Sequence, residues 1–280
     1  MGEPRPIAIP KDDATQRVLR RVHVNMPWKR MAQYFDVILE HRMNVEIGFG
    51  GAEMDEADPE DLERVATALR HRGCRVSLHG PFWGIEPGCV DPRVRRLAAE
   101  RISQFLDLAL VFQPVQLVCH TGFDPRHHVE YRDFWLEKSH AFWGRMAERA
   151  ASMRVPLLIE NVWEKEPSFH VDLLERVDSP YFGFCLDVGH QHSFSDTPLL
   201  TWLDRLSHQL REVHLHDNDG GHDYHWPVGD GSIDFKGLFE RLNARGLTPL
   251  LTVEPHTEAD LIKTLAGLAP FLERSHWPRG

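Results

Sequence analysis

The stretch PLLIENVWEKEPSFHVDLLERVDSPYFGFCLD, residues 156–187, holds the pattern that decides the fold. It begins with an apolar run at 156–161, continues through a helical pattern at 168–178, and ends in a second apolar run at 183–187. Continuous apolar runs of five or six residues are typical of strands that are buried on both faces. The stretch therefore predicts two buried strands that are joined by a helix.

The same alternation continues toward both ends of the chain. Strand-type runs lie at 21–25, 45–49, 75–79, 115–120, 156–161, 183–187, 212–216 and 249–254. Helical patterns lie between and after them, at 28–42, 59–72, 91–112, 131–153, 168–178, 198–210, 234–246 and 258–274. Eight strands that alternate with eight helices predict an α/β fold, a single-domain (β/α)8 barrel, also called a TIM barrel.

Short local signals set the boundaries of this predicted barrel. Asp-Pro pairs at 58–59 and 91–92 are typical helix starts, and Gly73 is a typical helix stop. A doubly wound open sheet is disfavoured, because no glycine-rich phosphate loop follows the first strand. We expect residues 1–16 to form a loose N-terminal extension and residues 17–280 to form the barrel domain.

Composition narrows the class of protein. The 280 residues carry a formal net charge of −10 and are 42% hydrophobic, so the chain can build a full core. The acidic balance argues against non-specific binding to nucleic acid or to a membrane surface. No apolar run is long enough to span a bilayer, and residues 1–10 lack the apolar stretch of a secretory signal. Four cysteines without a CxxC spacing are typical of reduced, buried thiols, and we expect a cytoplasmic protein.

Metal-type ligands stand at the ends of six consecutive predicted strands. In a barrel of this kind, the carboxyl ends of the strands and the loops after them carry the chemistry. A single histidine or aspartate there has an ordinary explanation, as a satisfied polar side chain or as a helix N-cap. Burying four carboxylates around one mouth, however, is costly unless cations balance their charge. We therefore predict a metal site at this rim, with nine candidate ligands: His79, His120, Glu160, Asp187, His190, His214, Asp223, His225 and Glu254.

The ligand types indicate which metals fit this site. Imidazole and carboxylate groups together favour zinc, manganese, iron or cobalt, and magnesium is less favoured. We expect one to three divalent ions, because nine ligands exceed what a single ion uses. Glu160 is the candidate bridge between ions.

Several motifs of the chain resemble those of one known superfamily. They are VEIGFGG (45–51), SLHGPF (77–82), LVCHTG (117–122), LLIEN (157–161), CLDVGH (185–190), HLHDNDGGHDYHWPVGDGSIDF (214–235) and LTVEP (251–255). From about residue 20 to 273, the chain resembles the xylose-isomerase-like TIM barrel superfamily. That superfamily groups sugar phosphate isomerases and epimerases with endonuclease IV. The motif of the predicted seventh strand is the most specific of the set.

The resemblance implies roles for the candidate ligands. The metal centre that the superfamily shares falls on Glu160, Asp187, His214 and Glu254. Endonuclease IV holds three zinc ions, and its additional ligands match the other five residues: His79, His120, His190, Asp223 and His225.

The flanks of these ligands differ from the DNA enzyme. HVNMPWKR stands at 23–30 in place of a Gly-x-His-Ser element. The chain has His-Thr-Gly at 120–122 where that enzyme has His-Pro-Gly, and Asp-Val-Gly-His at 187–190 where it has Asp-Thr-Cys-His. The predicted top-face loops also contain few lysines and arginines. These differences disfavour a nucleic-acid substrate.

Two enzyme activities suit the predicted constellation. The favoured one is a divalent-metal-dependent sugar or sugar-phosphate isomerase or epimerase, which acts on a small hydroxycarbonyl substrate through an enediolate. Glu160 and Glu254 are then the catalytic proton-transfer groups. The alternative is an endonuclease IV-like multinuclear zinc phosphodiesterase that acts on abasic-site DNA or on a small phosphoester. A non-catalytic metal-binding protein is disfavoured by the concave rim.

Aromatic residues in the same predicted loops are candidate substrate contacts, because aromatic faces suit sugar rings. Ordinary packing at the top of the barrel is the competing explanation for each of them. His216 shares a strand face with His214 by period two, so a place behind the ligands is expected for it, with an outer ligand or a substrate contact as the alternatives. The candidate substrate-binding set is Trp28, Phe82, Trp83, Trp163, His216 and Trp226. The resemblance also implies a small-molecule partner and the homo-oligomers that are common among isomerase-like members.

Overall fold

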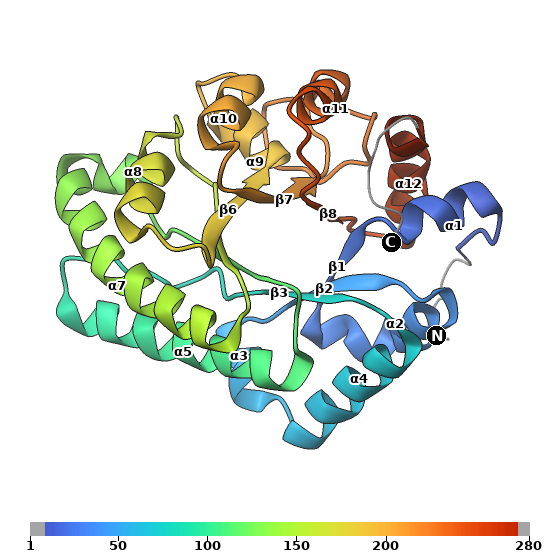
Figure 1. Ribbon diagram of the computed structural model, residues 1–280, viewed down its shortest axis with the longest axis horizontal. Coiled ribbons are helices and arrows are strands. Elements are labelled where there is room, and N and C mark those ends of the chain that lie inside the picture. The colour runs from blue at the N-terminus through green and yellow to red at the C-terminus, as the bar shows by residue number, and fades with distance from the viewer. Residues whose placement is uncertain (1–8, 274–280) are drawn as a thin grey trace.

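A closed barrel of eight parallel strands forms the centre of the molecule. The structure is a computed structural model that describes residues 9–273, and Figure 1 shows the strands enclosed by helices. Each strand pairs with the next one in the chain, and β1 pairs with β8 to close the ring. The strands are β1 His23–Pro27, β2 Asn44–Gly48, β3 Val76–His79, β4 Leu117–His120, β5 Leu157–Glu160, β6 Phe182–Asp187, β7 Leu210–Leu215 and β8 Leu250–Val253. The predicted fold class is confirmed.

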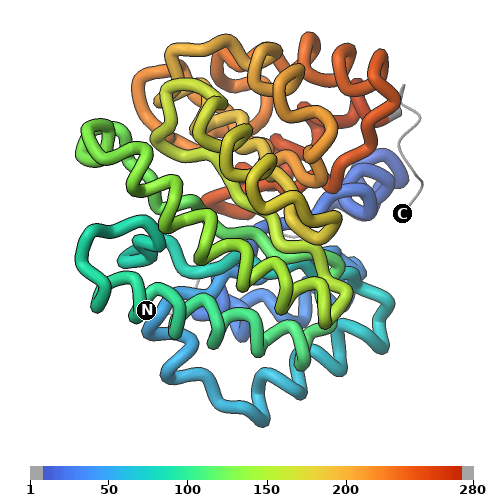
Figure 2. The backbone as a smooth tube through the Cα atoms, turned by 60° about the vertical axis from the view of Figure 1, so that its left-hand side comes forward, coloured from blue at the N-terminus to red at the C-terminus, as the bar shows by residue number. Residues whose placement is uncertain are grey.

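Helices surround the barrel on its outer side, as both views of the chain show (Figures 1 and 2). Those that match the eight predicted helices are α2 Trp28–His41, α4 Pro59–Arg72, α5 Pro92–Phe112, α7 Arg132–Met153, α8 Ser168–Val177, α10 Leu199–Leu206, α11 Phe235–Ala244 and α12 Glu258–Glu273. The structure adds the short elements α1 Asp13–Leu19, α3 Gly51–Glu56, α6 Pro125–His128, η1 Val129–Tyr131 and α9 Val188–Phe194. In the described part of the chain, no helix is long and apolar enough to cross a membrane.

Local signals explain where the helices begin and end. Asp58 caps α4 by accepting a hydrogen bond from the Glu60 N–H, and Pro59 is the first helical residue. Gly73 ends α4 with a φ of 73°, a left-handed conformation that glycine adopts at little cost. Asp91 caps α5 in the same way as Asp58 caps α4.

The segment expected as a loose N-terminal extension contains part of a helix. Residues 1–8 lie outside the described residues, but Asp12 caps α1 by accepting hydrogen bonds from the backbone N–H and hydroxyl of Thr15. Val18 and Leu19 of α1 are buried, and α1 lies beside α12 (Figure 1). The helix therefore covers one side of the barrel domain from residue 13 onward.

A layer of polar side chains lies inside the barrel, beneath the carboxyl ends of its strands. The Ser77 hydroxyl lies 2.9 Å from His23 Nδ1 and donates to Glu46 Oε2 at 3.1 Å. Glu212 accepts hydrogen bonds from Gln116 Nε2 and from the Thr252 hydroxyl. All of these side chains are buried. They form a hydrogen-bonded floor under the carboxyl ends of the strands.

Candidate metal centre

The carboxyl ends of six strands bring the predicted ligands together. His120 of β4 pairs with Glu160 of β5, and Asp187 of β6 pairs with His214 of β7, so neighbouring strands place ligands side by side. A cavity of about 380 Å³ opens above them. Asp187 and His214 lie fully buried below this cavity. The other seven predicted ligands line it: His79, His120, Glu160, His190, Asp223, His225 and Glu254.

Glu160 is the hub of the centre. Its Oε2 lies 3.0 Å from His79 Nε2 and 3.3 Å from His120 Nε2. Its Oε1 lies 3.1 Å from His190 Nδ1 on the other side. The side chain is 1% exposed, so the carboxylate is surrounded by imidazoles rather than by water. This arrangement suits a carboxylate that bridges two ions.

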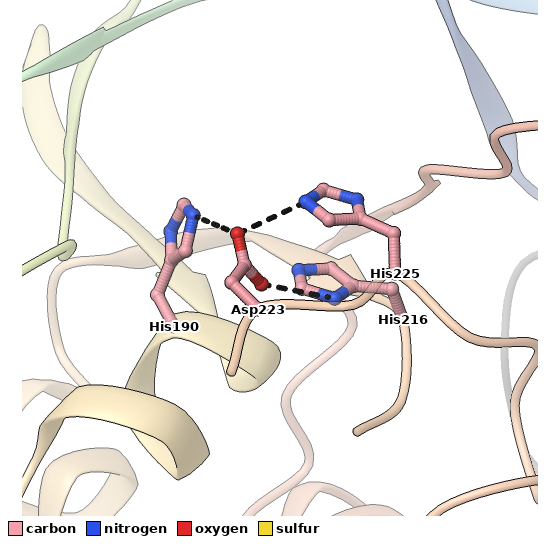
Figure 3. Close-up of side chains that lie close together, drawn as sticks. All are labelled: His190, His216, Asp223 and His225. Carbon is pink, nitrogen blue, oxygen red and sulfur yellow. Dashed lines mark hydrogen bonds and ion pairs between the residues drawn. The ribbon is translucent and has the colours of Figure 1, made fainter. Parts of the chain in front are cut away.

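A second group lies around Asp223 (Figure 3). Asp223 Oδ2 lies 3.3 Å from His190 Nε2 and 3.1 Å from His225 Nε2. Asp223 Oδ1 lies 3.6 Å from His216 Nδ1. One atom from each of these four side chains lies within 4.8 Å of the others, which suits a single ion.

A third group joins β6, β7 and β8. His214 Nδ1 lies 3.2 Å from Glu254 Oε1 and 3.8 Å from Asp187 Oδ2. Asp187 is also the N-cap of α9, because its Oδ1 accepts a hydrogen bond from the His190 N–H at 2.6 Å. Asp187 therefore serves as a helix cap and faces the candidate ligands at the same time.

His216 occupies a different place from the one expected for a substrate contact. Its Nε2 lies 3.1 Å from Asp187 Oδ1 and 3.8 Å from Glu254 Oε2, and the residue is only 2% exposed. His214 lies deeper, with Nε2 3.2 Å from Glu46 Oε1 in the polar floor. We therefore place His216 among the candidate ligands. The two-residue repeat of a strand predicts that both histidines lie on one face, but it does not predict how deep each one lies in the barrel.

Unsatisfied buried atoms test whether a metal ion fits. Buried polar atoms almost always have a hydrogen-bond partner. Yet in the described part of the chain, His216 Nδ1, Asp223 Oδ1, His214 Nδ1 and His120 Nδ1 have none. His216 Nδ1 and Asp223 Oδ1 are 3.6 Å apart, and two ligand atoms about 2.1 Å from a tetrahedral ion lie about 3.4 Å apart. The donor set therefore fits a divalent ion.

The electrostatics point in the same direction. Burial opposes the charged form of His79, but the hydrogen bond to Glu160 and its charge outweigh burial and raise the pKa of His79 to about 9. His225 behaves alike, because Asp223 and Glu254 overcome burial and raise its pKa to about 9. Burial would raise the pKa of Glu254, but the nearby histidines hold it well below its usual range. Protons on the imidazoles thus balance the carboxylates where divalent ions would otherwise do so.

The predicted aromatic contacts divide into two sets. Phe82 and Trp83 line the cavity, and Phe82 meets His120 edge-on at 4.6 Å. Trp163 lines an adjoining cavity. Trp28 and Trp226 are not among the residues that line either cavity, because Trp28 stacks on Phe49 at 5.3 Å and Trp226 stacks on Tyr224 at 4.8 Å. Ordinary packing therefore accounts for both Trp28 and Trp226.

Three polar residues of the cavity had no role assigned to them from the sequence. Asn25 Nδ2 donates to Glu254 Oε1 at 3.3 Å, which orients that carboxylate. Arg30 donates to the backbone carbonyl of His256, and His256 stacks on His225 at 4.7 Å. Asn25 is the last residue of the predicted first strand, Arg30 follows that strand, and His256 lies two residues after Glu254, so position near a strand end was the available signal.

Asp217 organises the loop that presents Asp223 and His225. Its carboxylate is 1% exposed and accepts hydrogen bonds from four backbone N–H groups at 2.9–3.1 Å, those of Asn218, Gly229, Gly231 and Ile233. Asp217 and Trp226 also form an antiparallel bridge across the loop. The loop is thereby fixed at both ends, although His225 itself has a left-handed φ of 53°.

Comparison with known proteins bears on the family and the fold. The family described as xylose isomerase-like TIM barrel matches residues 44–273. An uncharacterised protein of Methanocaldococcus jannaschii is 25% identical over 222 residues, which cover 77% of this chain and 76% of that protein. Fructoselysine 3-epimerase of Escherichia coli O157:H7 is 26% identical over 133 residues, which cover 43% of this chain and 48% of the epimerase.

Solved structures share the barrel over nearly its whole length. The crystal structure of a D-tagatose 3-epimerase-like protein has a TM-score of 0.79 and 22% identity, covering 90% of this chain and 97% of that one. A Thermus thermophilus protein soaked with zinc chloride has a TM-score of 0.73 and 26% identity, covering 91% of this chain and 99% of that one.

Proposed function

The chain belongs to the xylose isomerase-like TIM barrel family, and on that premise we propose that it is a divalent-metal-dependent sugar isomerase or epimerase. The observation that carries the proposal is a pair of carboxylates, Glu160 and Glu254, which flank His214 Nδ1 at 3.6 and 3.2 Å and face one cavity. The relative named fructoselysine 3-epimerase supports the same class of reaction. A cavity of about 380 Å³ lies within the range of small-molecule sites.

The ligand set determines what a bound ion contributes. A divalent ion held by Glu160, Asp187, Glu254 and His214 of β7 would polarise the substrate carbonyl and stabilise the negative charge that develops on its oxygen. The nearby histidines lower the pKa of Glu254, so this carboxylate is ionised at neutral pH, which is the form that a proton acceptor must have. Asn25 holds this carboxylate through a hydrogen bond to Oε1.

Proton transfer by the two carboxylates gives the reaction. One of them removes the proton from the carbon next to the carbonyl, which leaves an enediolate in the substrate. The other returns a proton, to the opposite face of that carbon in an epimerase or to the neighbouring carbon in an isomerase. Phe82 and Trp83 contribute apolar faces against which the sugar is held.

Solvent exchange tests this proposal directly. The zinc- or manganese-loaded protein is incubated with D-fructose, D-tagatose and related ketoses in D2O, and deuterium on carbon is measured by NMR. We expect exchange with at least one ketose, and a loss of at least about a hundredfold in Glu254→Gln. Glu240→Gln, at an exposed position on α11, is the matched control and should exchange normally. Exchange at the normal rate in Glu254→Gln would contradict the role given to Glu254.

A second candidate function rests on the group around Asp223. A site with three ions is what an endonuclease IV-like phosphodiesterase needs, and His190, His216, Asp223 and His225 supply a further set of ligands. Among the described residues that line the cavity, Arg30 is the one with a permanent positive charge, which disfavours DNA. Metal analysis separates the candidates: one ion per chain supports the isomerase, and three ions with cleavage of an abasic-site duplex support the phosphodiesterase.

A further inference from the structure

A second cavity of about 380 Å³ adjoins the first one. The two cavities share Phe82, Trp83 and His120 as a common wall. The second cavity then continues between the loops after β3, β4 and β5, where Ile85, Val162 and Trp163 line it. We call this second cavity the aromatic arm. Because the two cavities share these lining residues, they lie side by side at the mouth of the barrel, within reach of one extended ligand.

Buried contacts fix the walls of the aromatic arm. Glu164, which is 3% exposed, accepts hydrogen bonds from the Thr121 hydroxyl at 2.6 Å and from the Val162 N–H at 2.8 Å. These bonds tie the loop after β4 to the loop after β5. A Cβ on Gly122 would lie 2.2 Å from the Ile85 carbonyl oxygen, so the loops after β3 and β4 also touch. The arm is therefore a built cavity between ordered loops, which lowers the entropic cost of binding.

The side chains of the arm suit a ring. Trp83 is 84% exposed at the lip and packs edge-on against Phe82 at 4.7 Å. Trp163 lies against Phe194 at 4.5 Å, with the Arg126 guanidinium 4.1 Å from its ring centre. Such an exposed aromatic surface beside a cavity is typical of a binding site, and aromatic faces pack well against sugar rings.

The charges of the arm disfavour a phosphate. Among the described residues that line it, none is a lysine or an arginine, Glu86 and Asp124 are acidic, and His120, His127 and His128 are the titratable side chains that remain. Arg126, whose guanidinium lies 4.1 Å from the ring centre of Trp163, already pairs with Asp124 at 2.7 Å. Recognition of phosphate needs cationic side chains or free backbone N–H groups. An uncharged group is therefore the occupant that fits.

We propose that the substrate is a glycosylated ketose, with the ketose at the metal centre and a second, uncharged sugar ring in the aromatic arm. This inference rests on the proposed function, because the ketose is the part that reacts. A single hexose fills only the first cavity, whereas a disaccharide that ends in a ketose fills both. The arm thus determines the size and the charge of the substrate.

Relative rates of deuterium exchange test the inference with the metal-loaded protein. The substrates are D-fructose, D-fructose 6-phosphate and three glycosyl-fructoses that differ in linkage: turanose, lactulose and isomaltulose. We expect kcat/KM for at least one glycosyl-fructose to exceed that for D-fructose by about tenfold or more, with no such gain from the phosphate.

Variants of the arm make the test specific. Trp163→Ala should lower kcat/KM for the glycosyl-fructose about tenfold more than kcat/KM for D-fructose, and Trp163→Phe should restore most of the difference because it keeps a ring. Tyr224→Ala is the matched control, since Tyr224 is a 40% exposed aromatic residue that lines neither cavity, and it should leave the ratio unchanged.

The outcomes separate this inference from the proposed function. Exchange with D-fructose but no gain from any glycosyl-fructose would overturn the inference and leave the proposed function standing. Equal losses on both substrates in Trp163→Ala, or a gain from the phosphate, would also overturn it. No exchange with any of these ketoses, free or glycosylated, would overturn both.

Discussion

A contact between a glycine and a histidine controls the position of one candidate ligand. A Cβ on Gly189 would lie 1.9 Å from Cε1 of His216, so only glycine leaves room for that imidazole. We predict that Gly189→Ala displaces the His216 ring and lowers the affinity for zinc by about ten- to a hundredfold. Competition with a chromophoric chelator measures the affinity.

A second glycine provides the control for this substitution. Gly144 lies in α7, and a Cβ added to it would meet nothing within 4 Å, so Gly144→Ala should leave zinc binding unchanged and should not destabilise the helix. If Gly189→Ala binds zinc as tightly as the parent protein does, then His216 is not a ligand.

The raised pKa values of two histidines predict how metal binding depends on pH. His79 and His225 have pKa values of about 9 without metal, so both imidazoles are protonated at pH 7. A metal ligand must be neutral, and binding therefore expels these protons. We predict that zinc affinity rises as the pH increases from 6.5 to 9. Calorimetry in buffers of different ionisation enthalpy should show proton release at pH 7.

The same shifts set the stability of the metal-free protein. A histidine with a raised pKa stabilises the folded state fully below pH 6.5, and this contribution disappears as the pH rises through about 9.

The control for the calorimetric experiment is His208→Ala, at an exposed histidine outside the metal centre, which should leave proton release unchanged. Metal binding without proton release at pH 7 would contradict the charge state given to His79 and His225.

One carboxylate, that of Asp217, determines the shape of the loop after β7. Asp217 accepts four backbone hydrogen bonds, two at each carboxylate oxygen, and an amide at this position would lose two of them because its nitrogen only donates. We predict that Asp217→Asn lowers the metal content and exposes the loop to limited proteolysis, while the circular dichroism of the barrel is unchanged. The free energy of unfolding should fall by about 2–3 kcal/mol.

Another aspartate of the same loop allows a matched comparison. Asp230 is exposed and pairs with Lys263 at 3.3 Å, so Asp230→Asn changes the same charge without disturbing the loop. It should bind metal normally and resist proteolysis. A normal metal content in Asp217→Asn would mean that Asp223 and His225 hold their positions without this carboxylate.

The strands and long helices were predictable because their signals are local and strong. Strands buried on both faces appear as continuous apolar runs, and the eight predicted strands are all present. The predicted seventh strand begins too late, because β7 starts at Leu210 with the exposed polar Arg211 inside it. The short helix α9 was not predicted, because the ligand role was preferred for Asp187 over the role of a helix N-cap.

The residues of the candidate site could be predicted because the ends of the strands could be predicted. The nine predicted ligands lie at the ends of strands or in the loops after them, and the register of a parallel barrel brings them together. The depth of His216 and the role of Asp217 were not predictable. Both depend on contacts with distant residues, Gly189 for the first and Gly229 to Ile233 for the second.

Buried negative charge in this molecule gathers at the mouth of the barrel. Glu160, Asp187 and Glu254 are shielded from water, and Glu46 lies fully buried beneath them. Burial raises the pKa of Glu46 to about 7, and the charge of Glu212 adds to the effect. The barrel can keep such charges inside only if cations or protons balance them. A bound ion would therefore contribute to the stability of the entire fold.

This coupling predicts the effect of removing the metal. An ion that binds only the folded state at a hundred times its Kd stabilises that state by about 2.7 kcal/mol. We expect EDTA to lower the Tm of the zinc-loaded protein by about 5 °C or more, since about 1 kcal/mol corresponds to roughly 2–4 °C in a protein of this size. Thermal melts followed by circular dichroism give the Tm, and added zinc should restore it. EDTA that has been saturated with zinc beforehand is the control and should have no effect. If EDTA leaves the Tm unchanged, the carboxylates at the mouth are balanced by protons on the histidines alone, and no ion contributes to the fold.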